Sequence, residues 1–424
     1  MDGRPISIQH FMKVTTGLLA LFAAVATLST TLIGGLIARQ PALPASFQPE
    51  PADSLSGNKR LSLLSETTAA ITATPKPPSR PATLADFWSG KAGWVLEIPD
   101  TGLPIGESDT INMGNGVFWS YLHASGQSAG VVDSCGSPAP FPGCVTRWVS
   151  TDGGQHFALA EPKCVLTCSS CPCDADDLVD QQQYPRVVKT PGGVFYMVFE
   201  NGATTWFTSS FDGITWQSPM PIPHTGMWKL SDVTCGKAER IGPHPSFTSE
   251  YDCMAGGPPG LYITKTQIIV FVGLGQNPGH MGCFRSPLGG PYYFRRCAAN
   301  PLFSGAAEYG PLDALGAAAN PYFDFRYVTS ADVVRSGSYY YMSYEGIRGP
   351  STPAAGRDTQ FALGFARSWA LDSVWQKYPG NPVLDNIVDN WGIGHADLLI
   401  TNGITTMYAG TPEMKRGRYT LAFK

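Results

Sequence analysis

The 424-residue sequence has few charged side chains, 15% of the total against about 25% in average soluble proteins. Its 29 Lys and Arg residues are outnumbered by 33 Asp and Glu residues, which gives a formal net charge of −4. The chain therefore lacks the broad basic field that neutralises nucleic-acid phosphates, and no nucleic-acid partner is expected. It also lacks any Asn-X-Ser/Thr acceptor, which argues against a glycosylated ectodomain.

In contrast to charged residues, turn-forming and aromatic residues are abundant. The sequence contains 47 Gly and 36 Pro residues together with 17 Tyr, 21 Phe and 10 Trp, and 43% of all residues are hydrophobic. Aromatic residues favour strands, and this apolar content is too high for a disordered chain. The composition predicts an all-β fold with many turns.

The N-terminal region lacks charge over an unusually long stretch. No charged side chain occurs over residues 17–38, between Lys13 and Arg39, and this run exceeds the ~20 residues of a membrane span. We predict a signal anchor or a signal peptide over residues 1–39, with Ala42-Leu-Pro-Ala45 as a cleavage candidate. Either alternative places the remainder outside the cytoplasm, tethered to the membrane or secreted.

Residues 40–85 are rich in Pro, Ser and Thr and show no apolar period, so they are predicted to form a linker before a domain at 86–424. In an exported chain the ten cysteines can form as many as five disulfides. Bridges are expected for Cys283 with Cys297 and for Cys135 with Cys144. The four cysteines between Cys164 and Cys173 are dense enough for zinc, although export favours disulfides.

One pattern recurs five times beyond residue 86: a short apolar strand, a Gly/Asn/Ser turn and an aromatic strand. The five turns lie 65 to 77 residues apart, at Gly116, Gly193, Gln267, Ser338 and Gly403. This period suits a four-stranded blade and predicts a five-bladed β-propeller. Because the chain ends one strand short, residues 94–97 are expected to supply the missing outer strand of the last blade.

Each of the first four copies is followed by a second hairpin signal. Ser150–Phe157 and Ser210–Trp216 resemble Asp boxes, in which an Asp carboxylate accepts nearby backbone N–H bonds and a glycine occupies a positive-φ position. These turns are expected to be structural.

Polar side chains recur where a propeller usually binds ligands, since the start of each innermost strand and the end of the second strand share one face. Aligned starting positions carry Asp109, Arg186, Asp332 and Asp397, and aligned finishing positions carry His123, Glu200 and Glu345. Carboxylates crowded in a cavity raise one another's pKa, so one can act as an acid while another stays an ionised base. The alternative is a structural role, in which each residue only caps a loop or pairs locally.

Three motifs in residues 86–424 resemble the five-bladed propeller glycosidases, a superfamily of arabinanases, β-xylosidases and invertase-like fructosidases. The motifs are Gly392–Asp397, Tyr341–Gly346 and Ala366–Trp375, the last running on to Val383. The resemblance implies hydrolysis of glycosidic bonds in an oligo- or polysaccharide. No cofactor is required for it, although in some members a last-blade histidine holds an axial Ca²⁺ through water.

By position, Asp109 resembles the base or nucleophile of that group and His395 resembles the metal-holding histidine. Asp332 is a further catalytic candidate, and Arg186, Glu200 and Asp397 are candidates for substrate binding. The proton donor departs from the family pattern, because the second blade has Tyr184-Pro-Arg186 where an Asp precedes Pro and the third blade has no Glu-Gly-Pro. The candidates for this acid are, in order, Glu345, Glu200 and Glu250.

Two functional hypotheses therefore remain. The first is an extracytoplasmic glycoside hydrolase, which needs two carboxyl groups roughly 5–9.5 Å apart across the glycosidic oxygen. The alternative is a non-catalytic propeller that binds glycan or protein at the cell surface. A sialidase is a minor hypothesis, since sialidases have six blades and an arginine triad.

Overall fold

A computed structural model describes most of the C-terminal four fifths of the chain. All described residues belong to one compact unit, Ser79–Lys424. They are 80–124, 130–133, 136, 143–166, 182–201, 204–223, 225, 255–274, 279–305, 323–324, 327–347, 361–385 and 395–424. The predicted anchor at 1–39 and nearly all of the predicted linker lie outside them. No helix in these ranges combines the length and the apolar character that crossing a bilayer requires.

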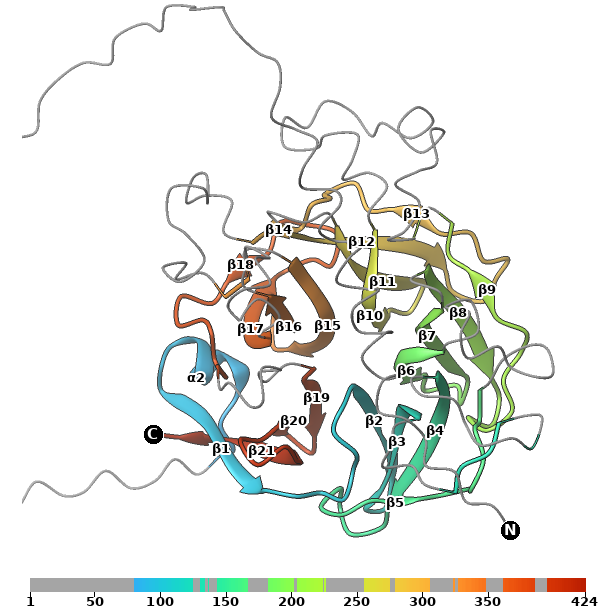
Figure 1. Ribbon diagram of the computed structural model, residues 1–424. Coiled ribbons are helices and arrows are strands. Elements are labelled where there is room, and N and C mark those ends of the chain that lie inside the picture. Colours follow the sequence, from blue (N-terminus) through green and yellow to red (C-terminus); the bar gives the residue numbers. More distant parts are fainter. Residues whose placement is uncertain are drawn as a thin grey trace, which may run out of the picture. The chain divides into compact units, whose positions relative to one another are not determined.

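Five antiparallel sheets stand around a common axis and confirm the predicted five-bladed propeller (Figure 1). Blade 1 consists of β2 (Ser108–Gly114), β3 (Val117–Ala124), β4 (Gly143–Ser150) and β5 (Ala158–Leu159). Blade 2 consists of β6 (Gln183–Lys189), β7 (Phe195–Asn201), β8 (Thr204–Ser210) and β9 (Met220–Pro221). Blade 3 consists of β10 (Ala255–Ile263), β11 (Gln267–Leu274), β12 (His280–Pro287), β13 (Arg295–Arg296) and β14 (Phe303–Ser304). Blade 4 consists of β15 (Tyr327–Ser336), β16 (Tyr339–Ile347), β17 (Phe361–Ser368) and β18 (Gln376–Lys377). Blade 5 consists of β19 (Asp397–Thr401), β20 (Ile404–Gly410), β21 (Arg416–Phe423) and β1 (Ala92–Ile98).

The ring is closed by the strand that the sequence predicts. β1 pairs with β21 antiparallel, with Trp94 opposite Leu421, and so completes blade 5 from the N-terminal side. A short helix before it, α2 (Leu84–Trp88), begins at a capping box formed by Thr83. This closure covers the sheet edge that the last three strands would otherwise expose.

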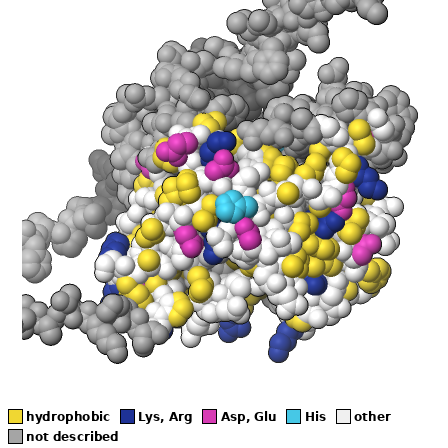
Figure 2. Space-filling model, turned by 90° about the horizontal axis from the view of Figure 1, so that it is seen from below, with side chains coloured by type: hydrophobic (Ala, Val, Ile, Leu, Met, Phe, Trp, Pro, Cys, Tyr) yellow, Lys and Arg dark blue, Asp and Glu magenta, His cyan; other side chains and the backbone are white. Residues whose placement is uncertain are grey.

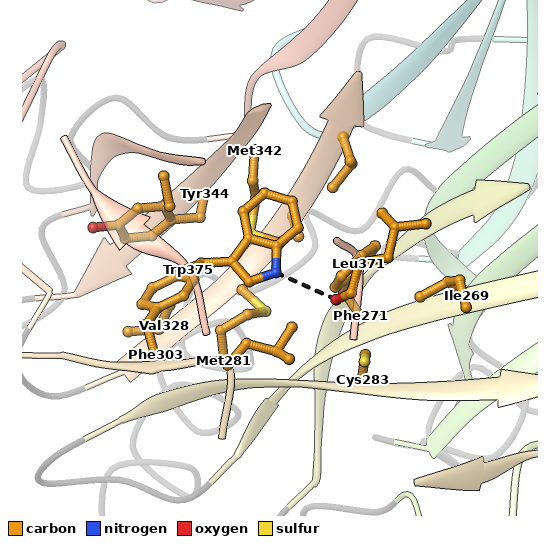
Figure 3. Close-up of a cluster of buried hydrophobic side chains, with 14 of the residues drawn as sticks. Ile269, Phe271, Met281, Cys283, Phe303, Val328, Met342, Tyr344, Leu371 and Trp375 are labelled. Carbon is orange, nitrogen blue, oxygen red and sulfur yellow. Dashed lines mark hydrogen bonds between the residues drawn. The ribbon is translucent and has the colours of Figure 1, made fainter. Parts of the chain in front are cut away.

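Apolar side chains fill the spaces between the blades. The largest cluster lies between blades 3 and 4, where the Trp375 indole packs among Phe271, Met281 and Met342 (Figure 3). Trp375 is 2% exposed, and its indole N–H donates to the Leu371 carbonyl at 3.3 Å.

We expect Trp375→Ala to lower the free energy of unfolding by about 3–5 kcal/mol, because it leaves a large cavity in this cluster. The matched control is Trp369→Ala, whose ring is 75% exposed and should cost less than about 0.5 kcal/mol. Urea denaturation of both variants measures the difference. Equal losses would contradict the assignment of the inter-blade core.

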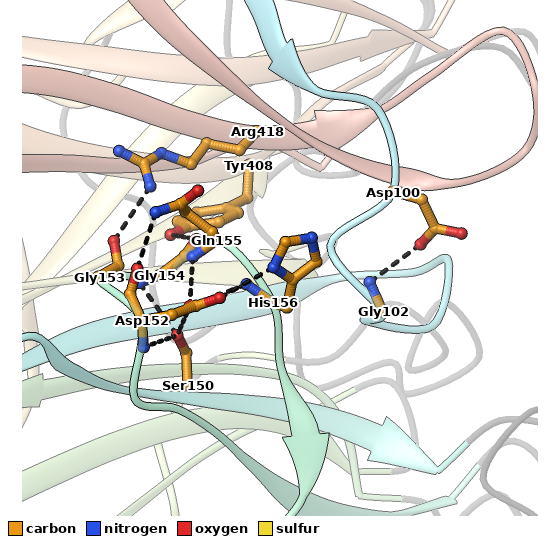
Figure 4. A network of polar contacts seen from close by, with 10 residues as sticks. All are labelled: Asp100, Gly102, Ser150, Asp152, Gly153, Gly154, Gln155, His156, Tyr408 and Arg418. Carbon is orange, nitrogen blue, oxygen red and sulfur yellow. Dashed lines mark hydrogen bonds and ion pairs between the residues drawn. The ribbon is translucent and has the colours of Figure 1, made fainter.

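The Asp boxes are structural turns, as expected. The Asp152 carboxylate accepts the N–H groups of Gln155 and His156, both at 3.0 Å (Figure 4). The same turn ties blade 1 to blade 5, because the Tyr408 hydroxyl donates to the Gly154 carbonyl at 2.6 Å. Seen from below relative to Figure 1, the surface shows a histidine among acidic side chains and a mixture of hydrophobic and charged groups (Figure 2).

The described cysteines form two disulfides. Cys283 and Cys297 are bonded as predicted, with their Cα atoms 5.4 Å apart. The predicted partner of Cys144 was wrong, because Cys144 is bonded to Cys164. The reason is tertiary: the backbone of Leu166 bridges that of Val145, which brings the segment after blade 1 alongside β4. The bonded Cys164 is therefore not a zinc ligand, and the other three cysteines of that cluster lie outside the described residues.

Candidate active site

The four predicted starting residues meet at the propeller axis. Asp109, Arg186, Asp332 and Asp397 come from blades 1, 2, 4 and 5, and all are buried, with exposures of 7%, 1%, 8% and 0%. We call them the inner ring. Blade 3 adds no side chain to this ring, since its aligned position is Gly260, where a Cβ would lie 2.4 Å from the Ala331 carbonyl oxygen.

Carboxylates of the inner ring connect neighbouring blades. Asp109 accepts the backbone N–H of Val187, which joins blade 1 to blade 2, and Asp332 accepts that of Leu398, which joins blade 4 to blade 5. One oxygen each of Asp109, Asp332 and Asp397 lies within 4.8 Å of the others. A structural role for the ring is thus combined with a concentration of negative charge.

Arg186 is directed across the axis. Its guanidinium donates to the Ser108 carbonyl at 3.0 Å, the Ser330 hydroxyl at 3.1 Å and the Ala396 carbonyl at 3.3 Å, and it lies 4.0 Å from Asp109. Burial raises the pKa of Asp109 well above its ordinary value, and the charges of Asp397 and Asp332 raise it further. Burial and the Asp332 charge raise the pKa of Asp397 to about 7.

A second layer of side chains lies two residues before the inner ring in the sequence, at the start of the same strands or just ahead of them. The outer layer consists of Glu107, Tyr184, Ser330 and His395. Contacts place this layer at the axis, because His395 pairs with Glu107 and stacks on Tyr184, and Ser330 accepts a hydrogen bond from Arg186. Tyr184, Ser330 and His395 have φ angles of 53°, 53° and 58°, an uncommon backbone conformation that marks the irregular entry of these strands.

Two buried carboxyl groups converge on one imidazole in this layer. Nδ1 of His395 pairs with the Glu107 carboxylate and lies 3.3 Å from an oxygen of Glu345. Glu107 and Glu345 are 0% and 1% exposed, whereas the His395 side chain is 23% exposed. The Glu107 carboxylate and the His395 imidazole are held together both by charge and by a side-chain hydrogen bond.

The two glutamates differ in protonation. Burial raises the pKa of Glu345 to about 8. Burial alone would also raise the pKa of Glu107, but the adjacent His395 and Arg186 hold it below the ordinary value. Although burial disfavours a charged imidazole, the two glutamates raise the pKa of His395. A protonated and an ionised carboxyl group thus lie side by side at neutral pH.

The other two finishing residues lie near this cluster without joining it. Burial raises the pKa of Glu200 to about 8, and burial lowers that of His123 to about 4. Glu200 is opposite Gln183 on β6 and does not pair with Arg186. Glu250, the third acid candidate, lies outside the described residues.

Sequence reasoning missed three residues of this site, namely Glu107, Tyr184 and Arg416. Glu107 could have been found from the strand period, because it precedes Asp109 by two, whereas a register shift separates Tyr184 from Arg186. Arg416 could not, since it comes from β21 and reaches the axis to donate to the His395 carbonyl at 2.5 Å. Its guanidinium is a second buried cation near Asp397, and its positive charge balances part of the acidic cluster.

No family model matches the sequence, and no curated protein matches it. Similar solved structures include the catalytic domain of a GH62 α-L-arabinofuranosidase from Coprinopsis cinerea, at 11% identity and a TM-score of 0.46, covering 78% of this chain and 96% of that one. A GH43 endo-arabinanase from Bacillus licheniformis is similar at 12% identity and a TM-score of 0.44, covering 78% and 96%. A xylan β-1,4-xylosidase from Bacillus halodurans C-125 is similar at 13% identity and a TM-score of 0.46, covering 77% and 54%. The similarity to these structures is one of fold.

We expect Glu200→Gln to change how stability depends on pH. The folded-state pKa of Glu200, about 8, lies above the ordinary 4.5, so the unfolded chain releases this proton first and stability falls as pH rises from about 4.5 to 8. Glutamine removes that loss, and the variant should gain stability relative to the native protein at pH 8 but not at pH 4. Thermal unfolding across this range measures it, with the exposed Glu413→Gln as the control. An equal gain at both pH values would contradict the argument.

Proposed function

We propose that this protein is an extracytoplasmic glycoside hydrolase that cleaves oligo- or polysaccharides with carboxyl groups at the propeller axis. The observation that carries the proposal is the convergence of Asp109, Asp332, Glu107 and Glu345 from two blades far apart in the sequence. Hydrolysis of a glycosidic bond needs one carboxyl group that donates a proton and one that is ionised. The axis contains groups of both kinds.

In this proposal Glu345 donates the proton to the leaving oxygen. Asp109 acts as base or nucleophile, as its position in the first blade implies, and Asp332 sets its orientation and charge. Arg186, Glu200 and Asp397 contribute to substrate binding. Glu107 is a second candidate for the ionised group, because it pairs with His395 at the same depth as Glu345.

Location outside the cytoplasm is supported by the two described disulfides, which persist in oxidising compartments. Anchoring through residues 17–38, or secretion after their cleavage, rests on the uncharged run alone. Neither the location outside the cytoplasm nor the anchoring or secretion depends on whether the protein is a catalyst.

The axial Ca²⁺ implied by the family resemblance is proposed at His395. Nδ1 of this residue faces Glu107 and Glu345, so only Nε2 is left to hold an ion through water. An ion there would add positive charge that polarises a bound sugar. Glu107 and Glu345 fix the orientation of the ring.

If Asp109 and Glu345 have these roles, Asp109→Asn and Glu345→Gln should each lower turnover ~10²–10⁴-fold, the usual contribution of acid–base catalysis. Release of sugars from a panel of plant, fungal and bacterial glycans measures this, with Glu413→Gln as the matched surface control. A substrate with a good leaving group should rescue Glu345→Gln and not Asp109→Asn, since only a poor leaving group needs the donated proton.

The same panel separates the alternatives. Loss of activity in Glu107→Gln with full activity in Asp109→Asn would move the ionised role to Glu107. Equal losses of Glu345→Gln on both substrates would move the acid elsewhere, first to Glu200. A folded protein that binds a glycan but releases no sugar would favour the non-catalytic binding propeller.

A further inference from the structure

A cavity of about 330 Å³ lies at the seam of the ring, between blades 1 and 5. The β2–β3 and β19–β20 hairpins line it, with Asn115 and Asn402 at their turns. The inner ring lies at the starts of β2 and β19, whereas these turns follow their ends. The cavity is therefore at the opposite end of these strands from the inner ring. Its volume falls within the ~300–1,000 Å³ of pockets that bind small molecules.

The buried part of the lining is held by contacts that cross the seam. Arg418 of β21 donates through Nη1 to the Gly153 carbonyl at 3.0 Å, and the Tyr408 hydroxyl of β20 donates to the Gly154 carbonyl at 2.6 Å (Figure 4). Tyr408 is 1% exposed, and the Arg418 side chain is 15% exposed. The contacts that join blade 5 to the Asp-box turn of blade 1 thus fix this part of the cavity before a ligand binds.

The rim carries two amide groups that are free to bind a ligand. Asn115 and Asn402 are both exposed and occupy equivalent turns, with φ angles of 53° and 52°. Neither side chain has a hydrogen-bond partner among the described residues. Asn112, by contrast, donates to the Thr401 hydroxyl at 3.3 Å and accepts the N–H of Gly114 at 2.8 Å. Each free amide offers an acceptor oxygen and two donor N–H groups.

The charge of the lining limits the class of ligand. No Asp or Glu side chain of the described residues lines the cavity, so these residues offer no carboxylate to a cation. The charged group in the lining is Arg418, and the Glu97 carboxylate, 3.6 Å from its Nε, offsets that charge. Nη2 of Arg418 has no hydrogen-bond partner among the described residues, so it can donate to a ligand. A neutral ligand rich in hydrogen-bonding groups suits this lining better than an ion.

Two apolar side chains complete the lining. Phe118 is 7% exposed and Ile404 is 42% exposed, so each presents carbon atoms to the cavity. Sugars combine hydroxyl groups, which both donate and accept hydrogen bonds, with C–H faces that pack on apolar side chains. Amide, guanidinium and apolar groups around one small cavity match that combination.

We propose that this cavity binds a neutral sugar residue of a glycan, at a second site remote from the candidate active site. Asn115 and Asn402 bond to its hydroxyl groups, Arg418 donates from Nη2, and Ile404 contacts a C–H face. Because the described lining contains no carboxyl group, the sugar is bound here and not cleaved. The inference goes beyond the proposed function, since it requires no catalysis at the axis.

The test follows the Ile404 methyl signal by NMR in the full chain with labelled isoleucine methyl groups. D-Xylose, L-arabinose, D-galactose and D-glucose are titrated separately, and at least one should shift this signal in a saturable manner. Ile263, beside the corresponding hairpin of blade 3, is the internal reference and should not shift.

Asn115→Gly combined with Asn402→Gly removes both amides and keeps the turns, because glycine adopts positive φ freely. This double variant should weaken binding by roughly tenfold or more, since each hydrogen bond contributes up to about a factor of ten. Ser338→Gly, at the hairpin turn of blade 4, is the matched control and should bind like the native protein. Glu345→Gln should keep the Ile404 shift, and the double variant should keep any release of sugars from the glycan panel. Failure of this site and failure of the proposed function are therefore distinguishable.

The absence of a saturable Ile404 shift with all four sugars would overturn the proposal. Unchanged affinity in the double variant, or loss of the shift in Glu345→Gln, would also overturn it, because the sugar would then bind elsewhere. Tighter binding of D-glucuronate than of the neutral sugars would replace it with an anion site at Arg418.

Discussion

The central constraint on this structure is the burial of charge at the propeller axis. Five blades can meet only if the starts of their innermost strands face one another, and in four of the five blades those positions carry aspartates or an arginine. Buried charges are tolerated when they are paired or hydrogen-bonded. Asp109 and Asp332 satisfy this by accepting backbone N–H groups from the next blade, so the groups that concentrate charge at the axis also hold the blades together.

Closure of the ring is what keeps these contacts in place. β1 completes blade 5 from the opposite end of the domain, and the Tyr408 hydroxyl connects blade 5 to the Asp-box turn of blade 1. Blades 1 and 5 both contribute to the axial clusters, through Glu107 and Asp109 on one side and His395 and Asp397 on the other. The seam of the ring and the candidate active site are therefore parts of the same assembly.

The two layers of the axis suit different tasks. In the inner ring, Asp109 and Asp332 accept backbone N–H groups from the next blade, and Arg186 lies 4.0 Å from Asp109, so this layer both joins the blades and concentrates charge. In the outer layer, two glutamates share one partly exposed imidazole, and their environments move their pKa values in opposite directions. Acid–base catalysis uses such pairs, in which the environment moves the pKa values of two neighbouring carboxyl groups apart.

The sequence by itself determined the number of blades, the closing strand and the inner ring. These depend on local rules: strand alternation with a period of two, Gly and Asn turns at a regular spacing, and a last copy short of one strand. The Cys283–Cys297 bridge was predictable for the same reason, because it spans a single hairpin.

Only the tertiary structure decided how those residues are paired. The contacts of Arg186 with Ser108, Ser330 and Ala396, the convergence of Glu107 and Glu345 on His395, and the bond of Cys144 to Cys164 all join segments that no local pattern relates. Strand periodicity fixes which face a side chain occupies, but not which blade lies across the axis from it. That choice follows from closing the ring, which brings together residues more than two hundred positions apart, such as Arg186 and Ala396.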